Sequence, residues 1–368
     1  MALNILMISS EFPPVVGGIA SHVDELSRAI QKQGNHVTVM SRLTNNAPPD
    51  EFNEQGVHIF RFILPGARIL YESILRRHIL ALISKKKYNI IHVHGMRPLH
   101  AIRNIDIPIC FTNHTSGFLK RLDASVRKKR STLRRINHTD LILAPSKELV
   151  ESAVSIGYRK PCIYIPNAID IDKFSPGKSI LRSKLDIPDN AFVVILARRL
   201  VNKNGVLYFA RAIADIDDSN CHFIIAGDGS ERAQFESILK HGKCWARVHM
   251  LGSIPNDQMP DVYRAGDLSV LPSLMEATSI AGLEAMGCGL SLIGTNVGGI
   301  PEIIQDNING YLVPPKSSGA IKEKICVLSQ LRQISKKMGE AGRVRACEFF
   351  SWPVIAKQTL LAYERILS

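Results

Sequence analysis

The sequence predicts an α/β protein built from two doubly wound domains. Short apolar runs alternate with amphipathic segments, and this pattern occurs twice along the chain, as in parallel sheets covered by helices. The 368 residues suit about two to three domains. A content of 45% hydrophobic and 21% charged residues is ordinary for a globular protein and excludes a disordered chain, a collagen-like fibre and a coiled coil.

The first domain is expected to open with a strand, a turn and a helix. Residues 3–10 form an apolar run with little alternation, which is typical of a strand buried on both faces. Gly17 and Gly18 end a turn-rich stretch, and a helical pattern follows that stops near Gly34. Further strands are expected in five apolar runs: 37–40, 57–62, 89–93, 108–112 and 141–144.

The strand–helix pattern then restarts, which predicts the second domain. Helices are expected at 204–214 and 257–265, and strands at 191–197, 222–226, 247–251, 268–271 and 291–295. The polar segment 165–190 is predicted to link the domains. Pro353 suits a first helical position and predicts a terminal helix.

The predicted domains are therefore 1–168 and 169–351, with helix 352–368 crossing back to the first. Ligands of such sheets bind beyond the carboxyl ends of the strands.

Composition also predicts the compartment. Seven scattered cysteines without a CxxC spacing fit a reducing environment and predict no zinc site. No apolar run approaches 18 residues, so a spanning helix is not expected. The first residues have no basic stretch and indicate a buried strand, not a signal peptide. We therefore expect a cytoplasmic protein.

Positive charge is concentrated in the first half of the chain. The formal net charge is +13, and residues 1–170 alone carry +10, which predicts an anionic partner. Residues 120–135 hold eight Lys/Arg against one acid. Aromatic residues are not interleaved, so an anionic membrane surface fits better than nucleic acid. The alternative is a solvated helix face.

The spacing of Glu276 and Glu284 indicates a binding site if a helix begins between them. Eight helical residues turn about 800°, so two helical glutamates would point in different directions. With a helix start near Ser279, however, Glu276 lies in the preceding loop and Glu284 in the second turn. Both then border one pocket, and the free amides of the helix N-terminus suit a diphosphate. The alternative is a solvated glutamate on a surface helix.

This region, residues 271–302, resembles the retaining glycosyltransferases of family 4. The shared features are Glu276-x7-Glu284 followed by Gly-Cys-Gly and Val-Gly-Gly-Ile-Pro-Glu. Shorter matches keep the family's order along the whole chain: 166–170, 174–176, 227–229, 251–253 and 309–315. The resemblance implies the GT-B fold, in which two Rossmann-like domains face each other across a cleft and the N-terminal one lies on the acceptor side.

The resemblance also implies roles for residues of the second domain. Glu276 would contact the donor sugar and Glu284 the nucleotide ribose, while backbone amides near Ser279 and Ile280 would meet the diphosphate. Here Ala277-Thr278-Ser279-Ile280 replaces the family's glycine-rich run. Gly227 and Gly252 match donor-binding loops.

A basic pair is implied at the end of the first strand of the second domain. Spacing favours Arg198 with Lys203, and two cations suit the charge of a departing nucleoside diphosphate. Alignment on Gly205 instead favours Arg199 and places Asn204 at the lysine position.

In the first domain, Gly17 and Gly18 match the family's glycine loop near the reaction centre. His114 matches the histidine that faces the donor sugar, and His94 is a weaker candidate. The His92-Val93-His94 spacing also suggests a metal, but no carboxylate-rich set accompanies it, so we expect neither metal nor cofactor.

The sequence therefore predicts a retaining, metal-independent transferase of a hexose-type sugar. Its partners would be a nucleotide-sugar donor, a glycan or lipid-linked acceptor and the inner face of an anionic membrane, in surface polysaccharide or lipid-linked glycan synthesis. Nucleic acid is not expected. The alternatives are a GT-B-fold sugar-nucleotide epimerase and a non-catalytic membrane-associated scaffold. The donor base (UDP, GDP or ADP), the sugar and the acceptor stay open.

Overall fold

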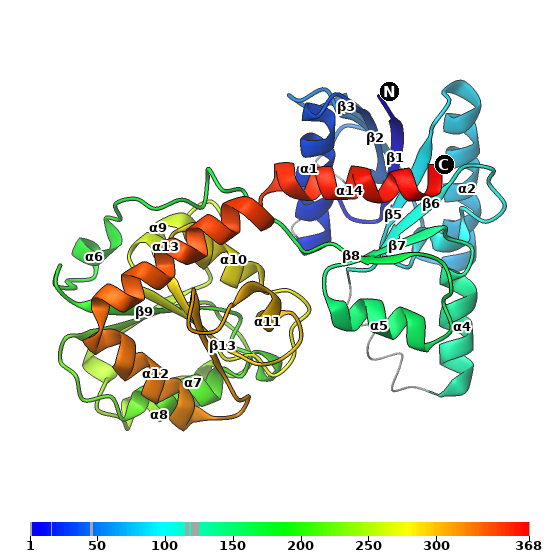
Figure 1. Ribbon diagram of the computed structural model, residues 1–368. Helices are drawn as coiled ribbons and strands as arrows, with labels where there is room; N and C mark the ends of the chain where they lie inside the picture. Colours follow the sequence, from blue (N-terminus) through cyan, green and yellow to red (C-terminus); the bar gives the residue numbers. More distant parts are fainter. Residues whose placement is uncertain (1, 16, 45–46, 115–117, 119–124, 368) are drawn as a thin grey trace. The chain divides into compact units, whose positions relative to one another are not determined.

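Two sheets form the framework of the chain in its computed structural model (Figure 1). The structure describes all residues except 1, 16, 45–46, 115–117, 119–124 and 368. Unit 1 contains Met1–Asn167 and Trp352–Ser368, and unit 2 contains Ala168–Ser351.

Unit 1 is built on an eight-stranded sheet with the order β3-β4-β2-β1-β5-β6-β7-β8. Neighbouring strands are parallel except β3 and β4, which are antiparallel. The apolar runs expected to be strands all form strands here. The strands are β1 (Asn4–Ser9), β2 (His36–Arg42), β3 (Asp50–Phe52), β4 (His58–Phe62), β5 (Ile90–His94), β6 (Ile109–Thr112), β7 (Leu141–Ala144) and β8 (Cys162–Tyr164).

Helices pack on both faces of this sheet. In α1 the residues Val23, Leu26 and Ile30 recur at helical spacing and are buried. The C-terminal helix α14 packs against α1 (Figure 1), and its Tyr363 hydroxyl forms a 2.7 Å hydrogen bond with His92 Nδ1 of β5. The helices are α1 (Gly18–Lys32), α2 (Arg68–Lys85), η1 (Pro98–His100), α4 (Val126–Ile136), α5 (Lys147–Ser155) and α14 (Trp352–Leu367).

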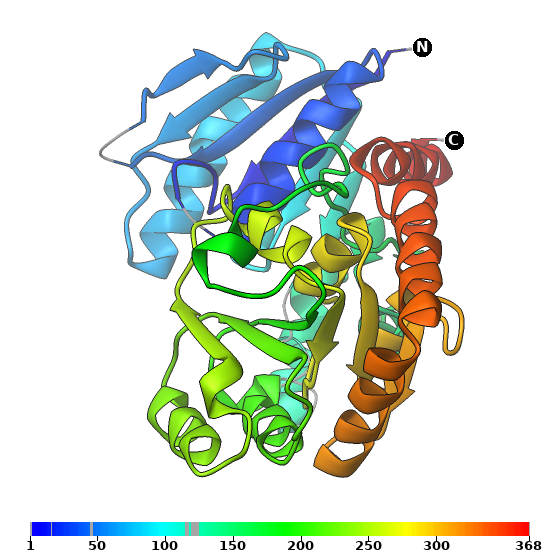
Figure 2. The ribbon, with the colours of Figure 1, turned by 90° about the vertical axis from the view of Figure 1, so that its left-hand side faces the viewer.

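Unit 2 is built on a six-stranded parallel sheet with the order β11-β10-β9-β12-β13-β14. Figure 2 shows these strands with α13 (orange) beside them, and α13 contacts β13 and β14. The strands are β9 (Phe192–Ala197), β10 (Cys221–Ala226), β11 (Val248–Gly252), β12 (Leu268–Leu271), β13 (Ser291–Thr295) and β14 (Gly310–Val313).

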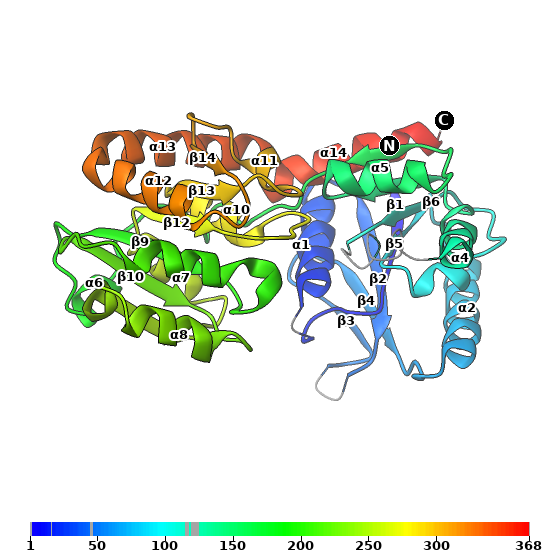
Figure 3. The same ribbon diagram turned by 90° about the horizontal axis from the view of Figure 1, so that it is seen from below.

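Both faces of this sheet are buried, as its uninterrupted apolar strands require. Phe192, Val194 and Leu196 face one core with α7, α8 and α12, which Figure 3 shows from below. Val193 and Ile195 face the other core, with α9, α10 and α11. The helices of unit 2 are α6 (Leu181–Lys184), η2 (Asn202–Asn204), α7 (Val206–Ala214), α8 (Arg232–Lys240), η3 (Trp245–Arg247), α9 (Met259–Arg264), α10 (Ile280–Gly287), α11 (Ile300–Ile303), α12 (Ser318–Gln330) and α13 (Arg332–Phe349).

The segment 165–190 is not the linker that its polar composition suggests. From Ala168 onward it belongs to unit 2, and Ile169, Phe174 and Ile187 are buried in a core of that unit. The Ile169 amide also donates a 2.8 Å hydrogen bond to the Phe350 carbonyl. A few apolar side chains at wide spacing therefore anchor an otherwise polar segment.

In each sheet the order of the parallel strands reverses at one place. In unit 1 the reversal lies between β1 and β5, and in unit 2 between β9 and β12. The carboxyl ends of the strands at such a switch point form a crevice in which ligands of open α/β sheets bind. Both places carry residues that the sequence analysis singled out.

Candidate active site

Arg198 occupies the switch point of unit 2. It follows β9 directly and is 9% exposed, and its Nη1 donates a 2.8 Å hydrogen bond to Ser279 Oγ. Its Nη2 donates to Ser273 Oγ and to Glu276 Oε2. One buried guanidinium therefore joins the end of β9, the loop after β12 and the N-terminus of α10.

Glu276 lies in the loop between β12 and α10, as the spacing required. Ser273 Oγ donates a 3.4 Å hydrogen bond to the Glu276 carboxylate. Thr295 Oγ1 donates a 2.6 Å hydrogen bond to the Ser273 carbonyl and fixes this loop against β13. Ser273 and Thr295 belong to the region 271–302 that resembles the family, but no sequence pattern marks the contact of Thr295, because it depends on which strands are adjacent.

Two glycines after β13 allow the chain to pass close to Glu276. Gly298 has a φ of 52°, and a Cβ there would lie 1.7 Å from the Glu276 carbonyl oxygen. A Cβ at Gly299 would lie 1.9 Å from the Ala277 carbonyl oxygen. The Gly299 amide donates a 3.2 Å hydrogen bond to the Glu276 carbonyl. The Val-Gly-Gly motif therefore supports the Glu276 loop by close packing.

Helix α10 starts at the expected place. Ser279 is its N-cap, and Ser279 Oγ accepts a 3.2 Å hydrogen bond from the Gly282 amide. Ile280 is the first helical residue and Glu284 lies in the second turn. The positive end of the helix dipole and the Arg198 guanidinium thus lie at one place, which favours an anion there.

Glu284 is 8% exposed and is held by two neutral partners. Its Oε2 accepts a 2.9 Å hydrogen bond from the Tyr263 hydroxyl, and its Oε1 accepts a 3.3 Å hydrogen bond from Asn256 Nδ2. Lys173 Nζ donates to Asn256 Oδ1 at 2.6 Å. Burial raises the pKa of Glu284 to about 7, because desolvation outweighs both hydrogen bonds. No sequence pattern marked Lys173, Asn256 or Tyr263.

The cations of the loop after β9, Arg198, Arg199 and Lys203, lie in different environments. Arg198 contacts Glu276, whereas Arg199 is exposed and its carbonyl accepts a 2.8 Å hydrogen bond from Asn204 Nδ2. The Lys203 side chain is exposed, and its carbonyl accepts a 2.8 Å hydrogen bond from the Leu274 amide. The structure therefore brings Arg198 to Glu276 and leaves Arg199 at the surface.

Gly227 lies beside the backbone of Arg198, and Gly252 contacts Gly227. Gly227 has a φ of 150°, and a Cβ there would lie 1.9 Å from the Arg198 carbonyl oxygen. The Gly227 amide donates a 2.7 Å hydrogen bond to the Gly252 carbonyl. These glycines hold the loops after β10 and β11 close to the loop that carries Arg198.

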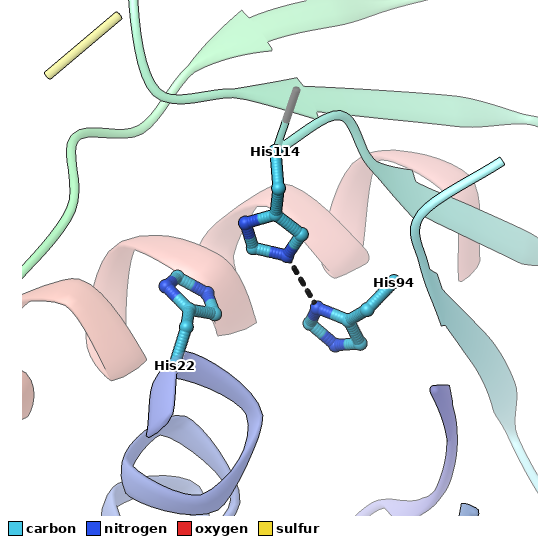
Figure 4. Close-up of side chains that lie close together, drawn as sticks. All are labelled: His22, His94 and His114. Atoms are coloured by element: carbon cyan, nitrogen blue, oxygen red, sulfur yellow. Dashed lines mark hydrogen bonds between the residues drawn. The ribbon is translucent and has the colours of Figure 1, made fainter. Parts of the chain in front are cut away.

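The candidates from the first domain lie at the switch point of unit 1. Gly17 has an extended φ of 176° and is the N-cap of α1, and Gly18 is its first residue. His94 ends β5, and its Nδ1 lies 2.9 Å from His114 Nε2, which follows β6 (Figure 4). Burial lowers the pKa of both imidazoles well below the usual value, so both are neutral near pH 7.

Solved structures share this fold over the whole chain. Sucrose-phosphate synthase of Thermosynechococcus elongatus is 20% identical, with a TM-score of 0.81 over 99% of this chain and 98% of the other. Anabaena HepE in complex with UDP-glucose is 19% identical, with a TM-score of 0.78 over 99% and 100%. The fold is GT-B, the class of two-unit α/β proteins to which these structures belong.

Sequence families define the protein further. Residues 16–173 match the model described as Glycosyltransferase Family 4, and residues 177–345 match glycosyl transferases group 1. A phosphatidylinositol N-acetylglucosaminyltransferase chain of Arabidopsis thaliana is 27% identical over 99% of this chain and 82% of its own length. The chain belongs to glycosyltransferase family 4, and it is a glycosyltransferase that uses a nucleotide-sugar donor.

Proposed function

We propose that this protein transfers a hexose-type sugar, with retention, from a uridine diphosphate donor to a lipid-linked acceptor at an anionic membrane surface. The observation that carries this proposal is the Arg198 cluster. A buried guanidinium, a helix N-terminus and Glu276 lie together at the switch point of unit 2, and Glu284 follows in the second turn of the same helix. This combination suits a ligand with an anionic diphosphate and hydroxyl-rich ends.

In this proposal, unit 2 binds the diphosphate, the ribose and the sugar of the donor through separate groups. The amides of Ser279 and Ile280 and the cations Arg198 and Lys203 receive the diphosphate. Glu284 accepts hydrogen bonds from the ribose hydroxyls, and its partners Tyr263 and Asn256 orient the carboxylate. Glu276 contacts the sugar, and its contact with Arg198 holds it beside the phosphates.

The proposed step is a front-face substitution. The bond between the anomeric carbon and the phosphate oxygen breaks, and the nucleoside diphosphate leaves with the electron pair. The acceptor hydroxyl forms its bond on the same face and gives its proton to the departing phosphate oxygen. Arg198 and Lys203 stabilise the charge that develops on that phosphate. The catalytic role expected for His114 stays a prediction.

Uridine is the base that the comparisons favour. HepE, with the same fold over the whole chain, was solved with UDP-glucose. The Arabidopsis relative is named for transfer of N-acetylglucosamine to phosphatidylinositol. A lipid-linked acceptor would also explain why positive charge is concentrated in unit 1.

The proposed membrane-facing surface consists of α2 and α4. Both helices contact η1, and Figure 3 shows them on the same side of the unit 1 sheet. Arg103, which follows η1, donates a 3.3 Å hydrogen bond to the Arg134 carbonyl of α4. Arg76 of α2 donates to the carbonyls of Ala101 and Arg103, so it is used within the unit and does not add to the surface.

Both basic and apolar side chains are exposed on α2 and α4, and a membrane interface can contact both kinds. The exposed basic residues are Arg77, Lys85, Arg127, Lys128, Lys129, Arg130 and Arg134, and the exposed apolar residues are Ile69, Leu70, Leu80 and Val126. Lys120 and Arg121 of the basic run lie outside the described residues. Among the residues described, no helix is long and apolar enough to cross a bilayer.

Donor hydrolysis and transfer test the proposal directly. The protein is incubated with UDP-, GDP- and ADP-hexoses and N-acetylhexosamines, with and without vesicles containing phosphatidylinositol. We expect slow hydrolysis of one UDP-sugar and a faster, vesicle-dependent transfer with the anomeric configuration kept. Conversion of the donor to an epimer without an acceptor would contradict the proposal, as would the absence of turnover with UDP-sugars.

A further inference from the structure

Three histidines from separate elements of unit 1 come together at its switch point (Figure 4). His22 lies in the first turns of α1, His94 ends β5, and His114 follows β6. One ring nitrogen from each lies within 4.8 Å of the other two. Among the described residues, no other three side chains of metal-binding type are this close. The His92-Val93-His94 spacing, which suggests a metal in the sequence, does not include His22.

We propose that His22, His94 and His114 form a binding site for one zinc ion or a similar late transition-metal cation. This proposal concerns binding and does not depend on the transferase reaction. The site would supply three nitrogen ligands and leave a fourth position open, as in three-histidine zinc sites. A set of imidazoles without a carboxylate favours zinc, copper or nickel over magnesium or calcium.

The ring positions fit such an ion with small movements. Three imidazoles bound tetrahedrally to zinc at about 2.0–2.1 Å hold their ring centres about 5 Å apart. The observed separations are 4.5 Å for His22 and His114, 5.2 Å for His94 and His114, and 5.7 Å for His22 and His94. The 2.9 Å between His94 Nδ1 and His114 Nε2 would widen by a few tenths of an ångström.

The protonation of the cluster also suits a metal. Zinc binds the neutral imidazole, and burial lowers the pKa of all three imidazoles below the usual value. Each ring therefore has a lone pair near pH 7. His94 would bind through Nδ1, which faces His114 Nε2, while His94 Nε2 is buried without a hydrogen-bond partner among the described residues and would not contact the ion.

Neighbouring groups define the edge of the site. Asn167 hydrogen-bonds to His22, which is the kind of outer contact that orients a metal-binding histidine. His92 is excluded as a ligand, because its two nitrogens already bond to Thr112 Oγ1 and to the Tyr363 hydroxyl. The Trp352 ring lies edge-on to His22 at 5.2 Å between centres, so its fluorescence reports on the site.

Metal titration of the full chain, without a polyhistidine tag, tests the proposal. A second histidine pair, His222 and His249, lies in unit 2 with 3.3 Å between ring nitrogens, so His249→Ala serves as the background. The chain has two tryptophans, and Trp245→Phe leaves Trp352 as the sole emitter. Zinc is followed by calorimetry, and cobalt by its visible absorption and its quenching of Trp352.

We expect one zinc per chain, a tetrahedral cobalt spectrum, quenching of Trp352 and a melting temperature that rises with zinc. His22→Ala and His94→Gln should each weaken binding more than 100-fold, beyond the roughly 10- to 100-fold cost of losing an outer contact, which is expected for Asn167→Ala. His36→Ala, at an exposed position of the same unit, should bind normally.

Circular dichroism tests whether each variant is folded. If His94→Gln is not folded, zinc binding by His22→Ala alone decides whether the three histidines bind the metal. The proposal would be overturned if zinc did not bind to the His249→Ala protein. It would also be overturned if zinc affinity were unchanged when His22→Ala is added.

Discussion

The Tyr263 hydroxyl donates a 2.9 Å hydrogen bond to Glu284, a carboxyl group whose pKa burial raises to about 7, so that it is only partly ionised at physiological pH. Tyr263 belongs to α9 and Glu284 to α10, and both are buried. Such an acid is poorly solvated until a ligand supplies more donors. A pair of vicinal ribose hydroxyls would supply them, which links the environment of Glu284 to its proposed role.

Glu284→Gln should weaken binding of the nucleoside diphosphate by roughly 10- to 150-fold, because hydrogen bonds to a charged group contribute about 1.5–3 kcal/mol. Turnover at saturating donor should change much less, since ribose binding is shared by ground and transition states. Calorimetry with UDP, beside steady-state kinetics, measures both. Glu323→Gln, at an exposed carboxylate of α12, is the matched control. Normal UDP affinity in Glu284→Gln would show that this assignment is wrong.

The same residue should make stability depend on pH. The folded pKa of Glu284 is about 7 and lies above the usual value of 4.5, so the folded state holds a proton that the unfolded state has lost. The unfolding free energy contributed by this group therefore falls as pH rises from about 4.5 through about 7. The difference in unfolding free energy between Glu284→Gln and wild type should therefore increase by about 2–3 kcal/mol in favour of the variant between pH 5 and pH 8. Urea unfolding without nucleotide measures this, and a constant difference would contradict it.

The sequence predicts the parts of the fold whose signals are local. The apolar runs that become β1, β9 and β13 are buried on both faces and are recognisable by composition. The strands β3, β8 and β14 have three or four residues, and pairing with a neighbour defines them more than their own composition.

The residues of the candidate site also fall into two groups, those that the sequence suggests and those that only the fold brings together. Arg198 and Glu276 are suggested by spacing and resemblance, but Tyr263 and Asn256 reach the site only because of strand order and helix packing. Neither Tyr263 nor Asn256 lies in a motif, so a single sequence gives no reason to prefer them over other polar residues. Likewise, the sequence leaves open whether Arg198 or Arg199 faces the phosphates, because the answer depends on which of the two side chains after β9 points toward Glu276.

Replacement of these adjacent arginines should give opposite outcomes. Arg198→Ala removes the cation proposed to face the diphosphate and leaves Glu276 without that ion pair. Because one lost donor to a developing charge costs about 100- to 1000-fold, kcat should fall by at least this much. Arg199→Ala, at the neighbouring exposed position, is the control and should stay within about twofold of wild type. Equal losses in both variants would contradict the assignment.

The surface of α2 and α4 should bind anionic membranes through charge. Basic residues near an anionic surface contribute about 1 kcal/mol each, so replacing Arg127, Lys128, Lys129 and Arg130 with alanine should weaken binding about 100- to 1000-fold. Flotation with phosphatidylserine vesicles measures this, and high salt should reduce the wild-type signal. Lys336→Ala with Lys337→Ala, on the exposed side of α13, is the control. Equal binding to neutral vesicles would exclude this mechanism.

Glu276→Gln should separate chemistry from nucleotide binding. Glutamine keeps the shape of the side chain and can still accept a hydrogen bond from Arg198, but it removes the negative charge. In the proposed reaction that charge stabilises the oxocarbenium-like sugar as the bond to phosphate breaks, so kcat should fall sharply. UDP lacks the sugar, and Arg198 stays in place, so affinity for UDP should barely change.

Single-turnover kinetics and calorimetry on Glu276→Gln make the comparison, with Glu284→Gln as the reciprocal case. If Glu276 were only a structural partner of Arg198, the loss of its charge would lower stability and shift UDP affinity while the rate at saturating donor stayed near normal. A near-normal rate in a folded Glu276→Gln protein would therefore reject a role for Glu276 at the reacting sugar and leave it as a support for Arg198.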